Sequence, residues 1–454
     1  MDAAPFRALR YDPRVVGRLQ AATAPAYDEL SPSTYAQHRI ANPYTVLQLL
    51  APEAPPPAPA SGRFRSAADA YHRLRRNKVL VEDPTPGFFL YELHELRGGA
   101  PVRMRGLLAA VAAGDARTSG IAVHEAVDLP RVERRAARLR AVPVDLAPVL
   151  VVAPQLPSDL RALLDRSPSA APVAALTDED GVDHRVWSRT DAEEVRAIRR
   201  GLAQTVGMIA DGHHRWAAAQ LLADRFLPPL RPGGVGDVGT GGGDGTGGGD
   251  GQAPWRTLAL VVDAAHEGPQ VRAVHRLLPA LPADWPRRLG PHFTLTRMPP
   301  DVRVLQAAMT AGEVVLGLLL PDAAVLLQAR DPAALRARLP EGTSPAWRAL
   351  DAALVEHVVL PLLAVDPAAA LARADLLAAA QEVAARSGGA GAATDAQRAG
   401  HGLPALLLLR PPSPAAVAAI ALGGERLPAK STFFRPKPRT GLLMRAITAP
   451  TAPA

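Results

Sequence analysis

Apolar residues recur at helical spacing in several stretches of the chain. In the stretch 67–77, Ala67, Ala70, Tyr71 and Leu74 follow one another at intervals of one to three residues and share one helix face. This spacing predicts an amphipathic helix. By the same pattern, helices are predicted at 67–77, 129–140, 192–202, 213–226, 351–363, 368–386 and 414–422.

Short apolar runs between these stretches predict strands. The run 149–153 has no polar residue at all, which is typical of a strand that is buried on both faces. Because strands and helices alternate, the sequence predicts an α/β protein with mixed sheets and flanking helices. Strands are predicted at 87–93, 149–153, 182–187, 205–210, 257–263, 314–320, 324–330 and 406–409.

A glycine-rich segment interrupts this pattern at 231–253. It offers almost no side chain that a core could use, so it predicts a flexible surface insertion. The spacing Gly234-x-Gly236-x-x-Gly239 matches a dinucleotide fingerprint, but no strand enters it and no helix leaves it, so we interpret the match as chance. We therefore predict an N-terminal α/β region at 1–230, the insertion at 231–253, and a C-terminal α/β region at 254–446.

Composition places the chain among globular proteins. Of its 454 residues, 48% are hydrophobic and 21% are charged, which is enough to form a sizeable core. The sequence has no cysteine, which excludes disulfides, thiolate metal sites and cysteine nucleophiles. The chain start lacks the pattern of a secretory signal, and no apolar run approaches the roughly 20 residues of a membrane span. We expect a cytoplasmic protein with no membrane partner.

The net charge of +7 invites a nucleic-acid interpretation, but its composition weakens that interpretation. Lysine occurs three times, at Lys78, Lys430 and Lys437, and the other 48 of the 51 basic residues are arginine. Together with abundant alanine and proline, this is typical of GC-rich coding. The positive charge therefore reflects composition in part, and a DNA-binding surface stays an alternative.

The strongest local motif is Asp211-Gly212-His213-His214-Arg215, at the predicted junction of a strand and a helix. A helix N-terminus exposes backbone N–H groups, and glycine lets the backbone approach a ligand closely. Arginine can bind phosphate through two hydrogen bonds, and the aspartate can cap the helix or hold a metal. The motif thus predicts a polyphosphate site. The alternative is a capped helix with ordinary surface histidines.

Two further segments are candidates for chemistry. His124-Glu125 ends a short apolar run, where the sites of α/β proteins tend to lie, although a single His-Glu pair often arises by chance. The segment 427–437 holds Lys430, Ser431, Thr432 and Lys437, and so retains two lysines in a chain that has almost none. This retention indicates a need for a compact ammonium group, with an exposed basic edge as the alternative.

Six segments in order resemble the domain of unknown function 1015 family. The matches span about Tyr27 to Leu443, nearly the whole chain, and the departures are Ala26, where proline is usual, and the glycine-rich insertion. The matching segments are Tyr27-Asp28-Glu29-Leu30-Ser31, Asn42-Pro43-Tyr44, His124-Glu125, Asp180-Gly181-Val182-x-His184-x-x-Trp187, Ala210-Asp211-Gly212-His213-His214-Arg215 and Pro428-x-Lys430-Ser431-Thr432-x-Phe434-x-Pro436-Lys437.

This family is similar to free-serine kinases of the ParB/sulfiredoxin class. The resemblance implies a ParB/sulfiredoxin-like nucleotide-binding core with additional α/β elaboration, and ATP or ADP as a cofactor. It also implies that Gly212, His214 and Arg215 bind the nucleotide phosphates. Two alternatives stay open: a ParB-like nucleotide-dependent DNA-binding protein, and a metabolite-binding regulator without turnover.

The leading hypothesis is a kinase that phosphorylates L-serine or a similar hydroxyl acceptor. A carboxylate base would accept the hydroxyl proton; Glu125, beside His124, is the first candidate, and Asp28 or Glu29 the next. Phosphate charge would be neutralised by the basic members of the two motifs, with Mg²⁺ at Asp211. The predicted cofactor-binding residues are Asp211, Gly212, His213, His214, Arg215, Lys430, Ser431, Thr432 and Lys437.

This hypothesis makes Arg215 essential for turnover but not for folding. Arg215→Ala is expected to abolish phosphoryl transfer, because a phosphate ligand is lost, while circular dichroism stays that of the parent protein. A variant with normal activity would refute the assignment.

Overall fold

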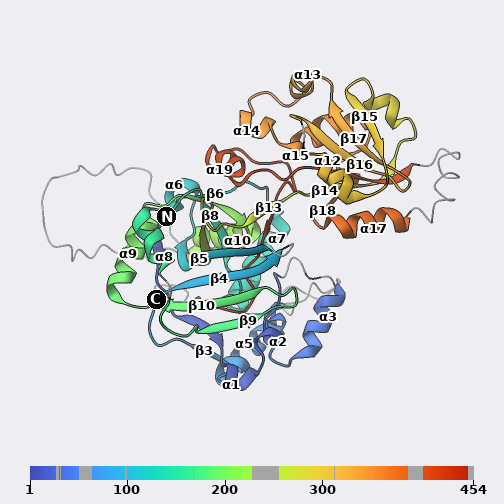
Figure 1. Cartoon of the computed structure of the whole chain (residues 1–454). Coiled ribbons are helices and arrows are strands. Elements are labelled where there is room, and N and C mark those ends of the chain that lie inside the picture. Colours follow the sequence, from blue (N-terminus) through green and yellow to red (C-terminus); the bar gives the residue numbers. More distant parts are fainter. Residues whose placement is uncertain are drawn as a thin grey trace, which may run out of the picture. The chain divides into compact units, whose positions relative to one another are not determined.

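The computed structural model describes residues 1–26, 30, 32–50, 64–97, 100–166, 168–226, 255–310, 312–386 and 402–447 (Figure 1). The chain forms two compact units. The first consists of Met1–Ala122, Val127–Gly268 and Pro436–Ala454, and the second of Val123–Ala126 and Pro269–Arg435. The predicted insertion at 231–253 lies outside the described residues.

A mixed sheet forms the centre of the first unit. Among the described residues it has nine strands, with β1 (Ala3–Ala4) paired to β5 beside the main path. The pairs β6–β11 and β8–β12 are parallel and the other pairs are antiparallel. The main path runs β6 (Ile121–Ala122), β11 (Gly207–Asp211), β8 (Val149–Ala153), β12 (Arg256–Asp263), β5 (Ala100–Ala112), β4 (Phe88–Arg97), β10 (Asp183–Arg189), β9 (Ala174–Thr177).

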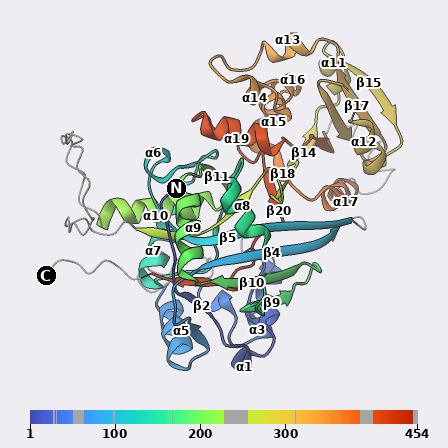
Figure 2. The same ribbon diagram turned by 60° about the vertical axis from the view of Figure 1, so that its left-hand side comes forward.

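Two helix pairs accompany this sheet. Helices α7 (Leu129–Ala141) and α10 (His213–Phe226) pack together through buried alanine, valine and leucine side chains. Helices α8 (Ser158–Asp165) and α9 (Ala192–Ala203) form the second pair (Figure 2). All five residues of β8 are buried, as the unbroken apolar run predicts.

The first unit extends past the glycine-rich segment. Strand β12 follows that segment, yet it pairs with β5 and β8, so the unit continues to Gly268 instead of ending near residue 230. The final segment of the described chain also returns to this unit, where β21 (Met444–Ala446) pairs with β2 (Ala8–Tyr11) and β7 (Val144–Asp145). Strand β3 (Leu80–Glu82) pairs with β2, so these strands form a second sheet of the first unit in the order β3, β2, β21, β7.

Helices cover the second sheet of the first unit. The amphipathic helix α5 (Arg65–Arg76) buries Ala67, Ala70, Tyr71 and Leu74, the four residues whose spacing predicts it. These side chains join one core with residues of β2, β3 and β21. The shorter elements here are α1 (Pro13–Val16), α2 (Leu19–Ala22), α3 (Pro32–Ala41), η1 (Val46–Gln48) and, elsewhere in the unit, α6 (Ala116–Ser119).

The second unit is built on an antiparallel sheet. In the described part of the chain this sheet has six strands, and a separate two-stranded sheet joins β13 (Gln270–Arg272) to β20 (Phe433–Arg435). The six strands run β15 (Phe293–Met298), β17 (Ala324–Ala329), β16 (Val315–Leu319), β19 (Leu403–Leu408), β14 (His275–Leu281), β18 (Leu371–Arg373).

Helices of the second unit surround this sheet (Figure 1). Helices α12 (Val302–Ala308) and α17 (Leu376–Arg386) share a core with it. A π-helical turn, η2 (Val355–Val359), joins α15 (Asp351–Leu354) to α16 (Leu360–Leu363). The remaining helices are α11 (Trp285–Leu289), α13 (Pro332–Arg336), α14 (Pro345–Arg348), η3 (Pro367–Ala369) and α19 (Pro414–Leu422).

The mixed α/β class is confirmed, and most predicted elements are present. The continuous helix predicted at 368–386 is wrong. Its first half forms η3 and β18, which pairs with β14, and α17 begins only after Asp375, whose carboxylate accepts a hydrogen bond from the Ala378 N–H. Sheet pairing therefore overrides the helix propensity of alanine there. Within the described residues, no helix is both long and apolar enough to span a membrane.

A buried histidine in β14 predicts a pH-dependent stability. His275 is 4% exposed, and burial, with nearby Arg276, lowers its pKa to about 4. The unfolded chain, with a pKa of about 6.5, binds more protons below pH 6.5. The free energy of unfolding should therefore fall by about 2 kcal/mol between pH 7 and pH 5 through this group. Urea unfolding at both pH values tests this: between pH 7 and pH 5, the free energy of unfolding of His275→Asn should fall by about 2 kcal/mol less than that of the parent protein. An equal fall in the two proteins would contradict the account.

Candidate functional site

A sharp turn joins β11 to α10 at the motif that begins with Asp211. Strand β11 ends at Asp211 and α10 begins at His213, so Gly212 alone makes the turn, with φ of +96°. A Cβ atom on Gly212 would lie 2.8 Å from Nε of Arg215, because that guanidinium folds back over the turn. The backbone angle therefore favours glycine, and a side chain here would also displace the Arg215 guanidinium.

Asp211 holds two cations, one on each carboxylate oxygen. Its Oδ1 lies 2.7 Å from Nζ of Lys437, and its Oδ2 accepts a hydrogen bond from Nη2 of Arg215. Arg215 also donates from Nη1 to the Pro148 carbonyl at 2.7 Å. The Asp211 and Lys437 side chains are only 12% and 6% exposed. The ion cluster thus joins the turn to the C-terminal segment, 226 residues later in the sequence.

Electrostatics keep the Asp211 carboxylate charged. Burial by itself would raise the pKa of Asp211, but Arg215 and Lys437, with a contribution from Arg135, hold that pKa below its usual range. One carboxylate then lies in direct contact with two cations, Arg215 and Lys437. Cations beside a helix N-terminus favour the binding of an anion.

The two histidines of the motif are part of the fold around α10. His213 is buried, and Nε2 of His214 accepts a hydrogen bond from the Asp128 N–H at 3.1 Å, where Asp128 caps α7. This bond ties the start of α10 to the start of α7. In this geometry Nε2 of His214 is an acceptor, so this atom does not donate to a phosphate.

The second unit brings the other two motifs together. His124 is fully buried, with Nε2 3.3 Å from Oγ1 of Thr432 and with its ring next to Phe434. The His124 carbonyl also accepts a hydrogen bond from the Leu427 N–H at 2.9 Å. The neighbouring Glu125 is half-buried. The predicted base and the predicted hydroxyl groups therefore lie on adjoining segments.

Lys430 lies in a strained turn that an arginine supports. Its φ is +55°, an angle that non-glycine residues rarely adopt, and its side chain is exposed. Buried Arg276 donates to the Lys430 carbonyl at 3.2 Å and to the Ala429 carbonyl at 3.1 Å. Ser431 closes the turn with a hydrogen bond of 2.6 Å to the Pro428 carbonyl. Strain of this kind tends to occur at functional sites.

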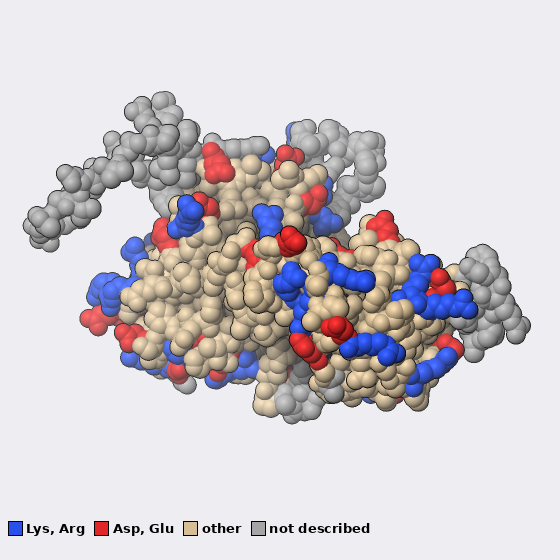
Figure 3. All heavy atoms as spheres, turned by 90° about the horizontal axis from the view of Figure 1, so that it is seen from above, with Lys and Arg blue, Asp and Glu red and all other residues tan. Residues whose placement is uncertain are grey.

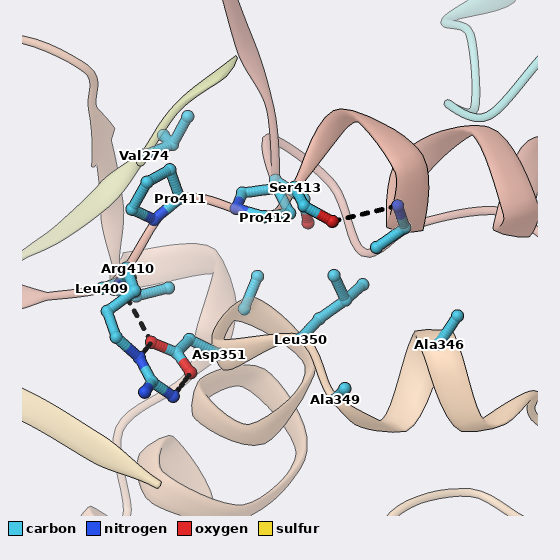
Figure 4. Close-up of a pocket in the computed structure, with 13 residues that line it drawn as sticks. Val274, Ala346, Ala349, Leu350, Asp351, Leu409, Arg410, Pro411, Pro412 and Ser413 are labelled. Atoms are coloured by element: carbon cyan, nitrogen blue, oxygen red, sulfur yellow. Dashed lines mark hydrogen bonds and ion pairs between the residues drawn. The ribbon is translucent and has the colours of Figure 1, made fainter. Parts of the chain in front are cut away.

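A cavity of about 330 Å³ lies in the second unit, beside this turn (Figure 4). Pro411, Pro412 and Ser413 line one side and Leu350 with its neighbours the other, while Arg410 and Asp351 form an ion pair at its edge. Ser431 is the predicted site residue that contributes to its lining. The volume is within the range of small-molecule sites.

The structure divides the predicted site residues between the two units. Asp211 to Arg215 and Lys437 belong to the first unit, whereas His124, Glu125 and the three residues 430–432 belong to the second. Asp28 and Glu29, the other candidate bases, lie outside the described residues. Their assignments as catalytic and cofactor-binding residues stay predictions.

The donors around Asp211 do not suit a magnesium ion. Mg²⁺ needs carboxylate or water oxygens, but both oxygens of Asp211 bind cations. In the described ranges, no group of three or more His, Asp or Glu side chains could hold a metal ion.

Two arginines that contact these segments were not identified from the sequence. They are Arg276, which supports the Lys430 turn, and Arg439, a buried residue two positions after Lys437. In a chain with 48 arginines, neither has a compositional signal, and their roles depend on long-range contacts. The sequence feature that comes nearest to indicating Arg439 is the motif 180–187, because its His184 binds Tyr91, which in turn binds the Arg439 backbone.

Comparison with known proteins identifies the family. A family model described as "Protein of unknown function (DUF1015)" matches residues 3–353, more than three quarters of the chain. The chain belongs to the DUF1015 family. This confirms the family resemblance for the five matching segments that lie within residues 3–353, whereas the segment 428–437 lies outside the matched range. Among curated protein sequences, none matches this DUF1015 protein.

Several solved structures resemble this DUF1015 protein with low sequence identity and a low TM-score. C-terminally truncated SbnI from Staphylococcus aureus has 12% identity and a TM-score of 0.32, over 72% of this chain and 82% of that chain. A mutant free serine kinase in complex with ADP has 13% identity and a TM-score of 0.31, over 69% and 84%. A conserved hypothetical protein from Pyrococcus furiosus has 13% identity and a TM-score of 0.27, over 71% and 92%.

The ion cluster predicts a specific pattern of stability. Asp211→Asn should lower the free energy of unfolding by about 3 kcal/mol, because two neighbouring cations lose their carboxylate. Adding Lys437→Met should recover part of that loss, since one uncompensated charge is removed. Urea unfolding of the two single variants and the double variant tests this. A double variant whose loss equals the sum of the single losses would contradict the coupling.

Proposed function

We propose that this DUF1015 protein is a small-molecule kinase that transfers a phosphoryl group from ATP or ADP to the hydroxyl of free L-serine. The observation that carries the proposal is the Gly212 turn at the start of α10, with Arg215 and Lys437 anchored on Asp211. This arrangement concentrates positive charge and backbone N–H groups where a polyphosphate would bind. The nucleotide and the acceptor follow from the motif resemblance.

Phosphoryl transfer requires mainly positioning and charge neutralisation. The γ-phosphoryl of ATP, or the β-phosphoryl of ADP, carries its negative charge on oxygens that cations can stabilise. Arg215 and Lys437 are suited to this role because Asp211 fixes both side chains before a ligand arrives. The exposed ammonium of Lys430, on its strained turn, is the further candidate.

The acceptor chemistry needs one carboxylate base. The serine oxygen forms a new P–O bond as the bond from phosphorus to the leaving nucleotide breaks, and the hydroxyl proton passes to the base. Glu125 is the first candidate, and Asp28 and Glu29 are the others. The products are O-phospho-L-serine and ADP, or AMP where ADP is the donor. We expect Mg²⁺ to arrive bound to the phosphates of the nucleotide, as is usual for nucleotide-dependent enzymes.

The DNA-binding alternative has less support. It needs a contiguous basic surface. On the face that Figure 3 shows, lysine and arginine side chains are interspersed with aspartate and glutamate among uncharged residues. A salt titration of DNA binding would test this alternative directly.

Incubation of the purified protein with L-serine, Mg²⁺ and ATP or ADP tests the proposal. Phosphoserine should form with the parent protein, and Glu125→Gln should reduce the rate by about 100-fold or more, the usual effect of removing a general base. Arg297→Ala, an exposed arginine of the second unit, serves as the control with unchanged rate. If the parent protein forms no phosphoserine with either nucleotide, the proposal fails.

A further inference from the structure

Arg439 is a fully buried arginine that lies two residues after Lys437. It is 2% exposed, and its guanidinium donates to acceptors from two separate segments of the first unit. Nη1 and Nη2 lie 2.7 and 2.9 Å from the two carboxylate oxygens of Glu179. Nε donates to Oγ1 of Thr23 at 2.6 Å, and Nη2 also donates to the Gln20 carbonyl at 2.9 Å.

The backbone of Arg439 is held by a chain of buried side chains. Its N–H donates to the hydroxyl of Tyr91 at 3.1 Å, and that hydroxyl lies 2.8 Å from Nδ1 of His184. Nε2 of His184 lies 3.1 Å from Oδ2 of Asp178. Because a carboxylate oxygen can only accept, Nε2–H of His184 donates to Asp178. Nδ1 of the neutral ring then accepts the Tyr91 hydroxyl proton, and the tyrosine oxygen accepts from the Arg439 N–H. This chain includes His184 of the motif that the proposed reaction does not use.

The residue after Arg439 is fixed in the same region. Thr440 and Ala24 exchange two backbone hydrogen bonds, of 2.9 and 3.0 Å, and Oγ1 of Thr440 donates to the Pro25 carbonyl at 3.0 Å. Residues 20–25 therefore hold the segment 439–440 from one side, while Glu179 and Tyr91 hold it from others. In sequence, residues 20–25 lead directly into the Tyr27–Ser31 motif.

Two prolines transmit this fixation to Lys437. The local sequence is Pro436-Lys437-Pro438-Arg439, and a proline restricts both its own φ and the conformation of the residue before it. The backbone between the fixed residue Arg439 and Lys437 can therefore adopt few conformations, which limits where the Lys437 ammonium group can lie. The stretch is short, since two residues span at most about 7 Å.

We propose that Arg439 is a positioning residue, which places the Lys437 ammonium on Asp211 and so sets the affinity for nucleotide phosphates. The part that concerns nucleotide rests on the proposed function. The part that concerns Lys437 does not, and it can be tested without any ligand.

Lysine footprinting of the full chain tests the position of Lys437 directly. The chain has only three lysines, so acetylation of each can be followed by mass spectrometry. In the parent protein, Lys437 should be modified slowly, because its side chain is 6% exposed and ion-paired. In Arg439→Met, its rate should rise by about tenfold, the factor for one lost charged contact, while Lys78 keeps its rate. An unchanged Lys437 rate in a folded variant would overturn the proposal.

A double-variant cycle on ADP affinity separates positioning from a general structural role. Lys437→Met should weaken ADP binding by about tenfold. Arg439→Met should weaken it similarly, but should have no added effect once Lys437 is replaced, because it acts through that side chain. Multiplicative losses in the double variant would contradict the proposal. If the parent protein binds no ADP, the proposed function fails, and the footprint alone decides the role of Arg439.

Control variants distinguish a specific effect on Lys437 from a general loss of stability. Arg445 is a half-buried arginine of the C-terminal segment, 3.0 Å from Asp145, so Arg445→Lys should affect stability but neither Lys437 labelling nor ADP affinity. Where Arg439→Met does not fold, two milder variants are used: Glu179→Gln removes the negative charge and one of the two acceptor oxygens, and Thr23→Val removes the hydroxyl acceptor of Nε. Both should raise Lys437 labelling by a smaller factor. If Arg445→Lys raised it as much as these variants do, the proposal would be wrong.

Discussion

The contact of one carboxylate with two cations is the interaction on which the candidate site depends. Asp211, at the end of β11, holds Arg215 from the following helix and Lys437 from the C-terminal segment. Burial makes this cluster most sensitive to the loss of Asp211, because two poorly hydrated cations would then lack their carboxylate. The same carboxylate that neutralises part of the charge also fixes where the remaining positive charge lies. A phosphate would then meet side chains that need little reorganisation.

The C-terminal segment gives this cluster its long-range character. Strand β21 pairs with β2 and β7, and Arg439 joins the residues before β21 to the turn at Asp178 and to the N-terminal region. Residues from both ends of the chain thus converge within the first unit. This explains how Asp211 and Lys437, which lie 226 residues apart in the sequence, come into contact within one unit.

Local sequence patterns predict those helices and strands whose formation depends mainly on nearby residues. The helix at 213–226 and the buried strand at 149–153 were predicted with the observed bounds, since periodicity and apolar runs report burial directly. They fail where pairing with a distant strand determines the structure, as in β18, whose alanine-rich sequence favours a helix but which pairs with β14. Nor could spacing reveal that Asp211 contacts Lys437, or that Arg439 stands apart from 47 other arginines. The pairing of strands far apart in sequence creates those contacts.

Binding calorimetry with adenosine, AMP and ADP tests the central claim most directly, because these ligands share one nucleoside and differ only in phosphate number. If the cluster at Asp211 binds phosphate, affinity should rise from adenosine to AMP to ADP, and should fall with ionic strength for the charged ligands. Equal affinities for the three ligands, or binding of none of them, would contradict the account.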